Sequence, residues 1–211
     1  MNKARNSSKV IPLFPLPLVL FPSEHLPLHI FEKRYLAMIN DIFEADGTFG
    51  VIRVEEGANA LASTGCMVRL VSVSRLHDGR MNILAYGYQK FSVLEMLDGR
   101  PYRQARVREI EESAPGRDSE AVARQIQTAL DDIARLSAKL QGHPTDVLDD
   151  RPWDPTELSY WVPARLYGSP SEQQRMLDMN TVYERLDAEY KLLDETRKQL
   201  AAKTALKDAF S

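Results

Sequence analysis

The hydrophobic periodicity of the sequence changes near residue 112, and this change limits the fold more than any other feature. Before it, apolar and polar residues alternate over five segments: 49–54, 66–76, 80–86, 90–97 and 102–110. After it, apolar residues recur at steps of three and four, first over 122–140. Alternation is typical of half-buried strands, and the longer steps are typical of amphipathic helices. The sequence therefore predicts an α+β protein, with a β-rich domain over residues 1–112 and an α-helical subdomain over 113–211.

The alternating segments are predicted to form a curved antiparallel meander. An Asp-Gly pair at 78–79 joins two of them closely enough for a tight hairpin. Val68 and Leu70 set one inward-facing phase, and Val71 and Val73 then set the opposite phase. Such a slip requires a bulge, as in sheets that close on themselves. We therefore expect a small barrel rather than a flat sheet.

Prolines alternate with large apolar residues over 11–27, ahead of these segments. Proline fixes φ and pushes the preceding residue toward extended geometry. The apolar residues between the prolines seek burial, so we expect a sheet edge that lies along the core. Residues 31–43 then show helical spacing, with Glu32 in the first turn and Gly47 just past the end, and they predict one amphipathic helix.

Three helices are predicted after residue 112. The long helix over 122–140 is expected to end at Gly142. Segments 169–172 and 181–184 each have the spacing of a capping box, which predicts the starts of two closing helices. The tail from Ala201 has too little apolar periodicity to predict its structure.

Composition and charge are those of an ordinary globular protein in a reducing compartment. Hydrophobic residues make up 44% of the chain and charged residues 27%, and the one cysteine, Cys66, cannot form an internal disulfide. Prolines interrupt the N-terminal apolar run, and no run approaches the roughly 20 residues that cross a membrane. We therefore expect a cytoplasmic protein with no membrane segment. The net charge of -3 argues against general nucleic-acid binding.

Several motifs resemble the amino-terminal substrate-recognition domain of Lon proteases, over roughly residues 10–195. The front motifs are Ile11-Pro-Leu-Phe-Pro-Leu16, Leu20-Phe-Pro22, Leu28-His-Ile-Phe-Glu-Lys-Arg-Tyr35 and Phe49-Gly-Val-Ile52. Later motifs are Asp78-Gly-Arg80, Gly87-Tyr-Gln-Lys-Phe91, Glu172-Gln-Gln-Arg-Met-Leu177 and Val182-Tyr-Glu-Arg-Leu186. Lys90 stands where the family usually has arginine, and Ser23 where glycine is common.

The resemblance implies a barrel related to the PUA fold, followed by a helical bundle. Lon enzymes continue into an ATPase module and a Ser-Lys peptidase, and this chain ends before either would fit. It also contains no phosphate-binding G-x-x-x-x-G-K-[ST] loop. The resemblance therefore implies a free-standing recognition domain, which in the family binds unfolded or tagged polypeptide.

No residue is predicted to be catalytic, to bind a cofactor or to hold a metal. Glu32 and Arg34 are expected to form a structural ion pair or a cap, because arginine is no general base at ordinary pH. His25 and His29 are four residues apart, but Pro27 interrupts the helix that would bring their rings together. The sequence also lacks a G-x-S-x-G nucleophile elbow.

Two further clusters are candidates for binding. Four arginines, Arg100, Arg103, Arg106 and Arg108, are followed at once by acidic residues, which favours a solvated strand face over an RNA site. Aromatic residues gather near the join between the two parts: Trp153, Tyr160, Trp161 and Tyr167. Such aromatics usually join subdomains, and the alternative is a groove for an extended apolar peptide. Trp153, Tyr160 and Trp161 are therefore the substrate-binding candidates.

The leading hypothesis is a non-enzymatic polypeptide-binding module in protein quality control, acting alone or as an adaptor. Its expected partners are unfolded or tagged polypeptides or a partner protein, with nucleic acid and membrane not expected. Two modes of peptide binding are expected as alternatives: in the aromatic groove, or by strand addition to an open barrel edge. The alternative hypothesis is RNA binding through the PUA-like barrel.

Overall fold

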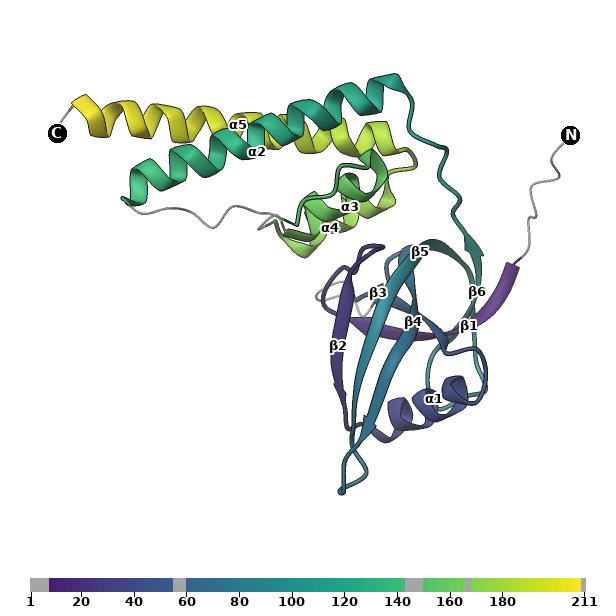
Figure 1. Cartoon of the computed structure of the whole chain (residues 1–211). Coiled ribbons are helices and arrows are strands. Elements are labelled where there is room, and N and C mark those ends of the chain that lie inside the picture. The colour runs from purple at the N-terminus through teal and green to yellow at the C-terminus, as the bar shows by residue number, and fades with distance from the viewer. Residues whose placement is uncertain (1–7, 55–59, 143–149, 166–167, 210–211) are drawn as a thin grey trace, which may run out of the picture. The chain divides into compact units, whose positions relative to one another are not determined.

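The structure, a computed structural model, describes residues 8–54, 60–142, 150–165 and 168–209 (Figure 1). The chain divides into two compact units. The first, the barrel unit, takes the described residues up to Glu111 together with Ala164–Asp178. The second, the helical unit, takes Glu112–Pro163 and the described residues from Met179 onward. The predicted α+β class, a barrel followed by helices, is confirmed.

Up to Glu111, the barrel unit contains one sheet of six strands and the helix α1 (Figure 1). Their bounds are β1 Ser8–Leu16, β2 His25–Ile30, α1 Lys33–Phe43, β3 Thr48–Arg53, β4 Thr64–Arg75, β5 Met81–Leu97 and β6 Gln104–Glu109. The strand order is β2-β5-β4-β3-β1-β6, and β6 also pairs with β5. That last pairing closes five strands into a ring. Among the described strands, β2 pairs with β5 alone and is the outer strand.

The pairings confirm most of the strand predictions. The strands β3, β4, β5 and β6 form the antiparallel meander, and β4 has a register shift between Leu70 and Ser72, where the change of phase predicts a bulge. The prediction of a sheet edge is wrong for β1, which pairs with β6 over 8–12 and with β3 over 13–16. Each half of β1 therefore pairs along one side, which leaves its prolines compatible with a closed ring.

Buried residues of the barrel unit form two clusters. One packs α1 against the strands and includes Phe14, Tyr35 and Met38. The other surrounds Phe91, whose side chain is fully buried. A Cβ atom at Gly50 would lie 2.8 Å from the Phe91 ring, and one at Gly65 would lie 2.6 Å from it. These two glycines therefore leave the space that the Phe91 ring occupies.

Ser23 has a positive φ of 68°, a conformation that costs a non-glycine residue about 1–2 kcal/mol. Its backbone N–H donates to the Gly87 carbonyl at 2.8 Å, which fixes this turn. Glycine loses more conformational entropy on folding than serine does, and this offsets about 0.5–1 kcal/mol of the gain from removing the unfavourable φ. We expect Ser23→Gly to stabilise the barrel unit by roughly 0.5–1 kcal/mol, measured by urea unfolding followed by circular dichroism. Ser23→Ala is the control, and an equal gain there would contradict the conformational explanation.

The remaining helices are α2 Arg117–Gln141, α3 Pro155–Arg165, α4 Pro170–Asp178 and α5 Val182–Ala209 (Figure 1). The helix α2 ends at Gly142, as predicted, with φ of 79°. The Ser169 hydroxyl and the Glu172 carboxylate cap α4 reciprocally, and Thr181 accepts from the Glu184 N–H at 3.2 Å, so both predicted helix starts are confirmed. The unpredicted tail continues as helix to the end of α5.

Two features of the helices differ from the expectation. The sequence does not predict α3, because its buried residues form a continuous run over 158–163 rather than one stripe. The helix α4 lies within the expected helical subdomain but groups with the strands. There the Gln174 side-chain amide donates to the Thr64 carbonyl at 3.1 Å. No helix among the described residues is long and apolar enough to cross a membrane.

Candidate functional site

A groove of about 260 Å³ opens on the barrel unit between β1, β2 and the start of α1. It is lined by Phe14, Pro15, Leu16, Leu28, His29, Ile30, Phe31, Glu32, Arg34 and Tyr35. A buried cavity of about 150 Å³ accommodates benzene. This groove therefore has room for one large side chain and part of its neighbour.

The local sequence explains the apolar walls of the groove. Alternation along β2 buries Leu26 and Ile30 and leaves Leu28 half-buried. Phe14 of β1 stacks on Tyr35 of α1, with ring centroids 4.2 Å apart and an angle of 25° between the ring planes. Burial raises the pKa of the Tyr35 hydroxyl, and the nearby Arg34 charge opposes that rise. The groove is thus built on a packed aromatic pair.

The outer strand β2 contributes three of its residues to the groove. An outer strand presents backbone N–H and C=O groups on the side away from its partner, except where proline removes a donor, as at Pro27. An extended peptide can add to such an edge while its alternate side chains enter adjoining pockets. The groove combines both elements of that binding mode.

Glu32 and Arg34 form the charged end of the groove. One carboxylate oxygen of Glu32 accepts from Arg34 Nε at 2.9 Å and lies 2.8 Å from Arg34 Nη2, so the predicted ion pair is confirmed. The same guanidinium lies 4.6 Å from the centroid of the Tyr35 ring. The side chains of Arg34 and Glu32 are 52% and 43% exposed, and such exposed pairs contribute little to stability. Their effect on the local charge is larger than their effect on folding.

The predicted helix starts at Phe31, but α1 begins at Lys33 with Glu32 as its N-cap residue, so Phe31 lies outside the helix. The Phe31 side chain is 63% exposed, and its ring centroid lies 6.1 Å from that of His29. His29 Nδ1 is 2.7 Å from the Asn82 side-chain oxygen, and Arg80 Nη1 is 3.3 Å from His29 Nε2. A proton on Nδ1 satisfies both contacts. Phe31 is therefore an exposed aromatic ring beside an ordered polar cluster.

The three sequence-predicted binding candidates lie in the helical unit and differ in exposure. Trp153 is 84% exposed and precedes α3, whereas Tyr160 and Trp161 are buried within α3. The Arg185 guanidinium lies 4.2 Å from the centroid of the Tyr160 ring. A binding role for these residues stays a prediction. Tyr167, the fourth residue of the aromatic cluster, lies outside the described residues.

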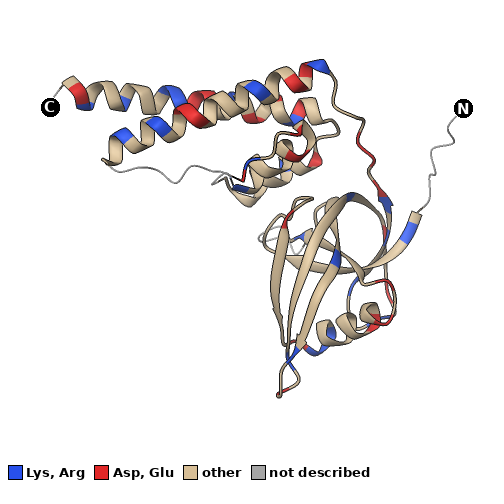
Figure 2. Cartoon of the chain, viewed as in Figure 1, with Lys and Arg blue, Asp and Glu red and all other residues tan. Residues whose placement is uncertain are grey.

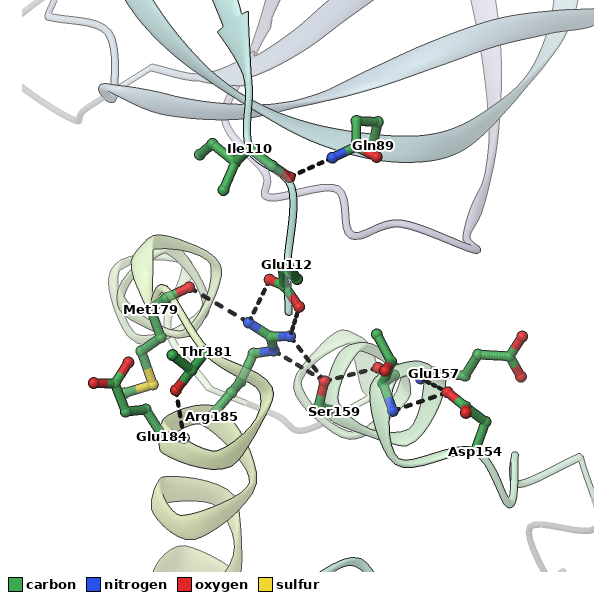
Figure 3. A network of polar contacts seen from close by, with 11 residues as sticks. Gln89, Ile110, Glu112, Asp154, Glu157, Ser159, Met179, Thr181, Glu184 and Arg185 are labelled. Atoms are coloured by element: carbon green, nitrogen blue, oxygen red, sulfur yellow. Dashed lines mark hydrogen bonds and ion pairs between the residues drawn. The ribbon is translucent and has the colours of Figure 1, made fainter. Parts of the chain in front are cut away.

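Arg185 is the centre of a buried polar network in the helical unit (Figure 3). Its Nη1 and Nη2 donate to the two carboxylate oxygens of Glu112 at 3.0 and 2.7 Å. Its Nε and Nη2 also lie 3.0 and 2.9 Å from the Ser159 hydroxyl. Bidentate, charge-assisted bonds of this kind are the strong class of hydrogen bond. The network joins α5 to α3 and to the segment that precedes α2.

Glu189 lies one turn after Arg185 on α5 and is fully buried. No described residue donates a hydrogen bond to either of its carboxylate oxygens. Burial raises the pKa of this carboxyl well above its ordinary value of 4.5, and the Arg185 charge only partly opposes that rise. Sequence periodicity does not reveal either residue, because both are charged types that are usually solvated.

The basic run gives little support to RNA binding. Arg100 pairs with Asp41 at 3.1 Å, and Arg106 pairs with Glu95 at 3.3 Å. Elsewhere, both signs of charge are interspersed along α2 and α5 (Figure 2). Phosphate binding depends on an accumulated positive field, which these neighbours reduce. The described residues also contain no group of three or more side chains suited to a metal ion.

Comparison with known proteins places this architecture in a family. Residues 10–195 match the model of the ATP-dependent protease La (LON) substrate-binding domain. The Lon proteases of Roseiflexus castenholzii and Anaeromyxobacter dehalogenans are 30% and 26% identical over 91% and 90% of this chain. The chain spans only about a quarter of their lengths, 25% and 24%. It belongs to the LON substrate-binding domain family.

Two solved structures share the fold. The N-terminal domain of the Mycobacterium avium complex Lon protease superposes with a TM-score of 0.68 at 17% identity, covering 90% of this chain and 98% of that one. The Lon N-terminal domain protein from Xanthomonas campestris superposes with a TM-score of 0.63 at 20% identity, covering 85% and 96%. The resemblance inferred from the motifs is thereby confirmed.

Proposed function

We propose that the groove beside β2 binds an extended polypeptide segment with an aromatic or large aliphatic side chain, and that this chain binds it without catalysing a reaction. The observation that carries the proposal is the position of an apolar groove along the outer strand of the sheet. Membership of a substrate-binding domain family supports it. A role in protein quality control in the cytoplasm, alone or as an adaptor, is part of the same proposal.

The groove lies elsewhere than the aromatic candidates, although the motif at 28–35 contains most of its residues. One feature of that motif indicates an exposed aromatic residue: Phe31 is followed directly by three charged residues. A large aromatic residue that borders a charged turn tends to lie at the surface, and aromatic residues are enriched among binding anchors. Phe31 is therefore the residue whose removal should affect binding without disturbing the core.

Phe31→Ala is expected to weaken peptide binding about tenfold, because a contact of an aromatic anchor contributes more than about 1 kcal/mol. The measurement is fluorescence polarisation with a labelled, unstructured apolar peptide and, in parallel, a labelled structured RNA, at low and moderate salt. Phe43→Ala is the matched control, because Phe43 is 59% exposed at the other end of α1 and does not line the groove.

The expected result is peptide binding with little salt dependence that Phe31→Ala weakens and Phe43→Ala does not. Salt-sensitive binding of RNA alone would overturn the proposal in favour of the RNA alternative. Equal loss in both variants would also contradict it, because the groove would then not be the site. Recovery of intact peptide after prolonged incubation tests the absence of catalysis.

A further inference from the structure

The groove carries two full charges along its lining, and they oppose one another. Glu32 and Arg34 are its formally charged lining residues, and their side chains pair with one another. The sum at the mouth is therefore close to zero. Removing either charged partner would change the electrostatic character of the groove more than its shape.

The carboxylate of Glu32 is committed to Arg34 rather than to the helix. Glu32 occupies the N-cap position of α1, yet its side chain makes no capping hydrogen bond there. One of its oxygens instead meets both Nε and Nη2 of Arg34. An N-cap side chain ordinarily accepts from the first helical N–H groups. This position therefore uses its carboxylate to neutralise a guanidinium at the mouth of the groove.

The Arg34 guanidinium has a second support that does not depend on Glu32. It lies over the ring of Tyr35, which is fixed by its stack on Phe14. A guanidinium can stack on an aromatic ring and still donate its N–H groups to a carboxylate in bidentate geometry. Loss of the Glu32 charge would thus leave a positioned carboxylate-binding group at the groove.

We propose that Glu32 sets the selectivity of the groove: by neutralising Arg34, it makes the groove prefer uncharged apolar or aromatic segments over segments that carry a carboxylate next to the apolar side chain. This inference rests on the proposed function, because it concerns the same groove. Glu32 is a specificity-determining residue, and the occupant is an extended polypeptide segment without acidic flanking residues.

The test uses three labelled peptides that share one aromatic core and differ in a flanking residue, which is glutamine, glutamate or lysine. The wild-type chain should bind the glutamine peptide more tightly than the glutamate peptide, and equal affinities would contradict the preference. Glu32→Gln should raise the affinity for the glutamate peptide roughly three- to fivefold, with a gain that falls as salt rises, as expected for an exposed ion pair. The gain for the glutamate peptide should exceed any change in affinity for the glutamine peptide.

Two variants make the test specific. Arg34→Gln added to Glu32→Gln should abolish the gain, because the carboxylate would lose its partner. Glu44→Gln is the matched control, since Glu44 is an exposed acid at the far end of α1 and does not line the groove. An equal gain with Glu44→Gln would show a general charge effect and overturn the inference.

The remaining outcomes separate the inference from the function on which it rests. If Phe31→Ala weakens the glutamine peptide but Glu32→Gln leaves peptide preference unchanged, the groove binds peptide and the selectivity role is wrong. If neither Phe31→Ala nor Phe43→Ala changes the affinity for any of the three peptides, the peptide site is elsewhere and both proposals fail.

Discussion

Arg185→Ala is expected to destabilise the helical unit by about 3–5 kcal/mol, the cost of breaking a buried ion pair from one side. The substitution leaves the Glu112 carboxylate without its bidentate partner, at a position where the Glu112 side chain is 9% exposed. It also removes the donor to Ser159 and the cation over the Tyr160 ring. The loss thus falls on three segments of one unit at once.

Tryptophan fluorescence measures this effect in the correct unit, because both tryptophans, Trp153 and Trp161, belong to the helical unit. Urea unfolding followed at this signal should show a lower midpoint for Arg185→Ala. The control is Arg197→Ala on the same helix, whose side chain is 38% exposed and pairs with Asp194 at 2.6 Å. It should cost at most about 1 kcal/mol. Similar losses in the two variants would contradict the assigned role of Arg185.

Glu189→Met is expected to stabilise the helical unit by roughly 1–3 kcal/mol at pH 7, because it removes a buried polar group without a hydrogen-bond donor. Methionine is unbranched and similar in length, so it fits the same space. The measurement is again urea unfolding followed by tryptophan fluorescence. A destabilised variant would show that the carboxyl has a partner in solution.

The pH dependence of this gain follows from the sign of the pKa shift. Burial raises the folded-state pKa of Glu189 above 4.5, so the folded protein retains a proton that the unfolded chain releases. Its contribution to stability is complete below the unfolded pKa and is lost as pH rises through the folded value. The advantage of Glu189→Met should therefore shrink as pH falls toward 4.5. Glu189→Gln, which cannot titrate, should flatten the profile; an unchanged profile would contradict the assignment.

Local patterns predicted the elements whose formation depends on nearby residues. The capping contacts at Ser169 and Thr181, the left-handed Gly142 and the bulge near Leu70 all follow from short-range rules. Long-range features were harder to predict. The sequence placed the N-terminal proline run at an edge, because it contains no signal for which strands will lie on either side of β1.

The sequence predicted a type of peptide site that the candidate groove matches, but not the residues that line it. An open barrel edge was among the expected peptide sites, but the residues named as binding candidates were those of the aromatic cluster near residue 160. Tyr160 and Trp161 are buried, whereas Phe31 is exposed beside the outer strand. Burial depends on which neighbours cover a side chain, and a lone aromatic in a sequence looks the same in either place.

The sequence by itself determined the strands of the meander, the helices other than α3, the bulge near Leu70 and several helix ends, because periodicity, capping and turn chemistry act over a few residues. Its motifs also determined the family. Only the tertiary structure decided that β6 returns to β5, that β2 stays at the edge beside a groove, and that Arg185 and Glu189 are buried. Those outcomes depend on contacts between residues far apart in the chain, whose burial and pairing no local pattern specifies.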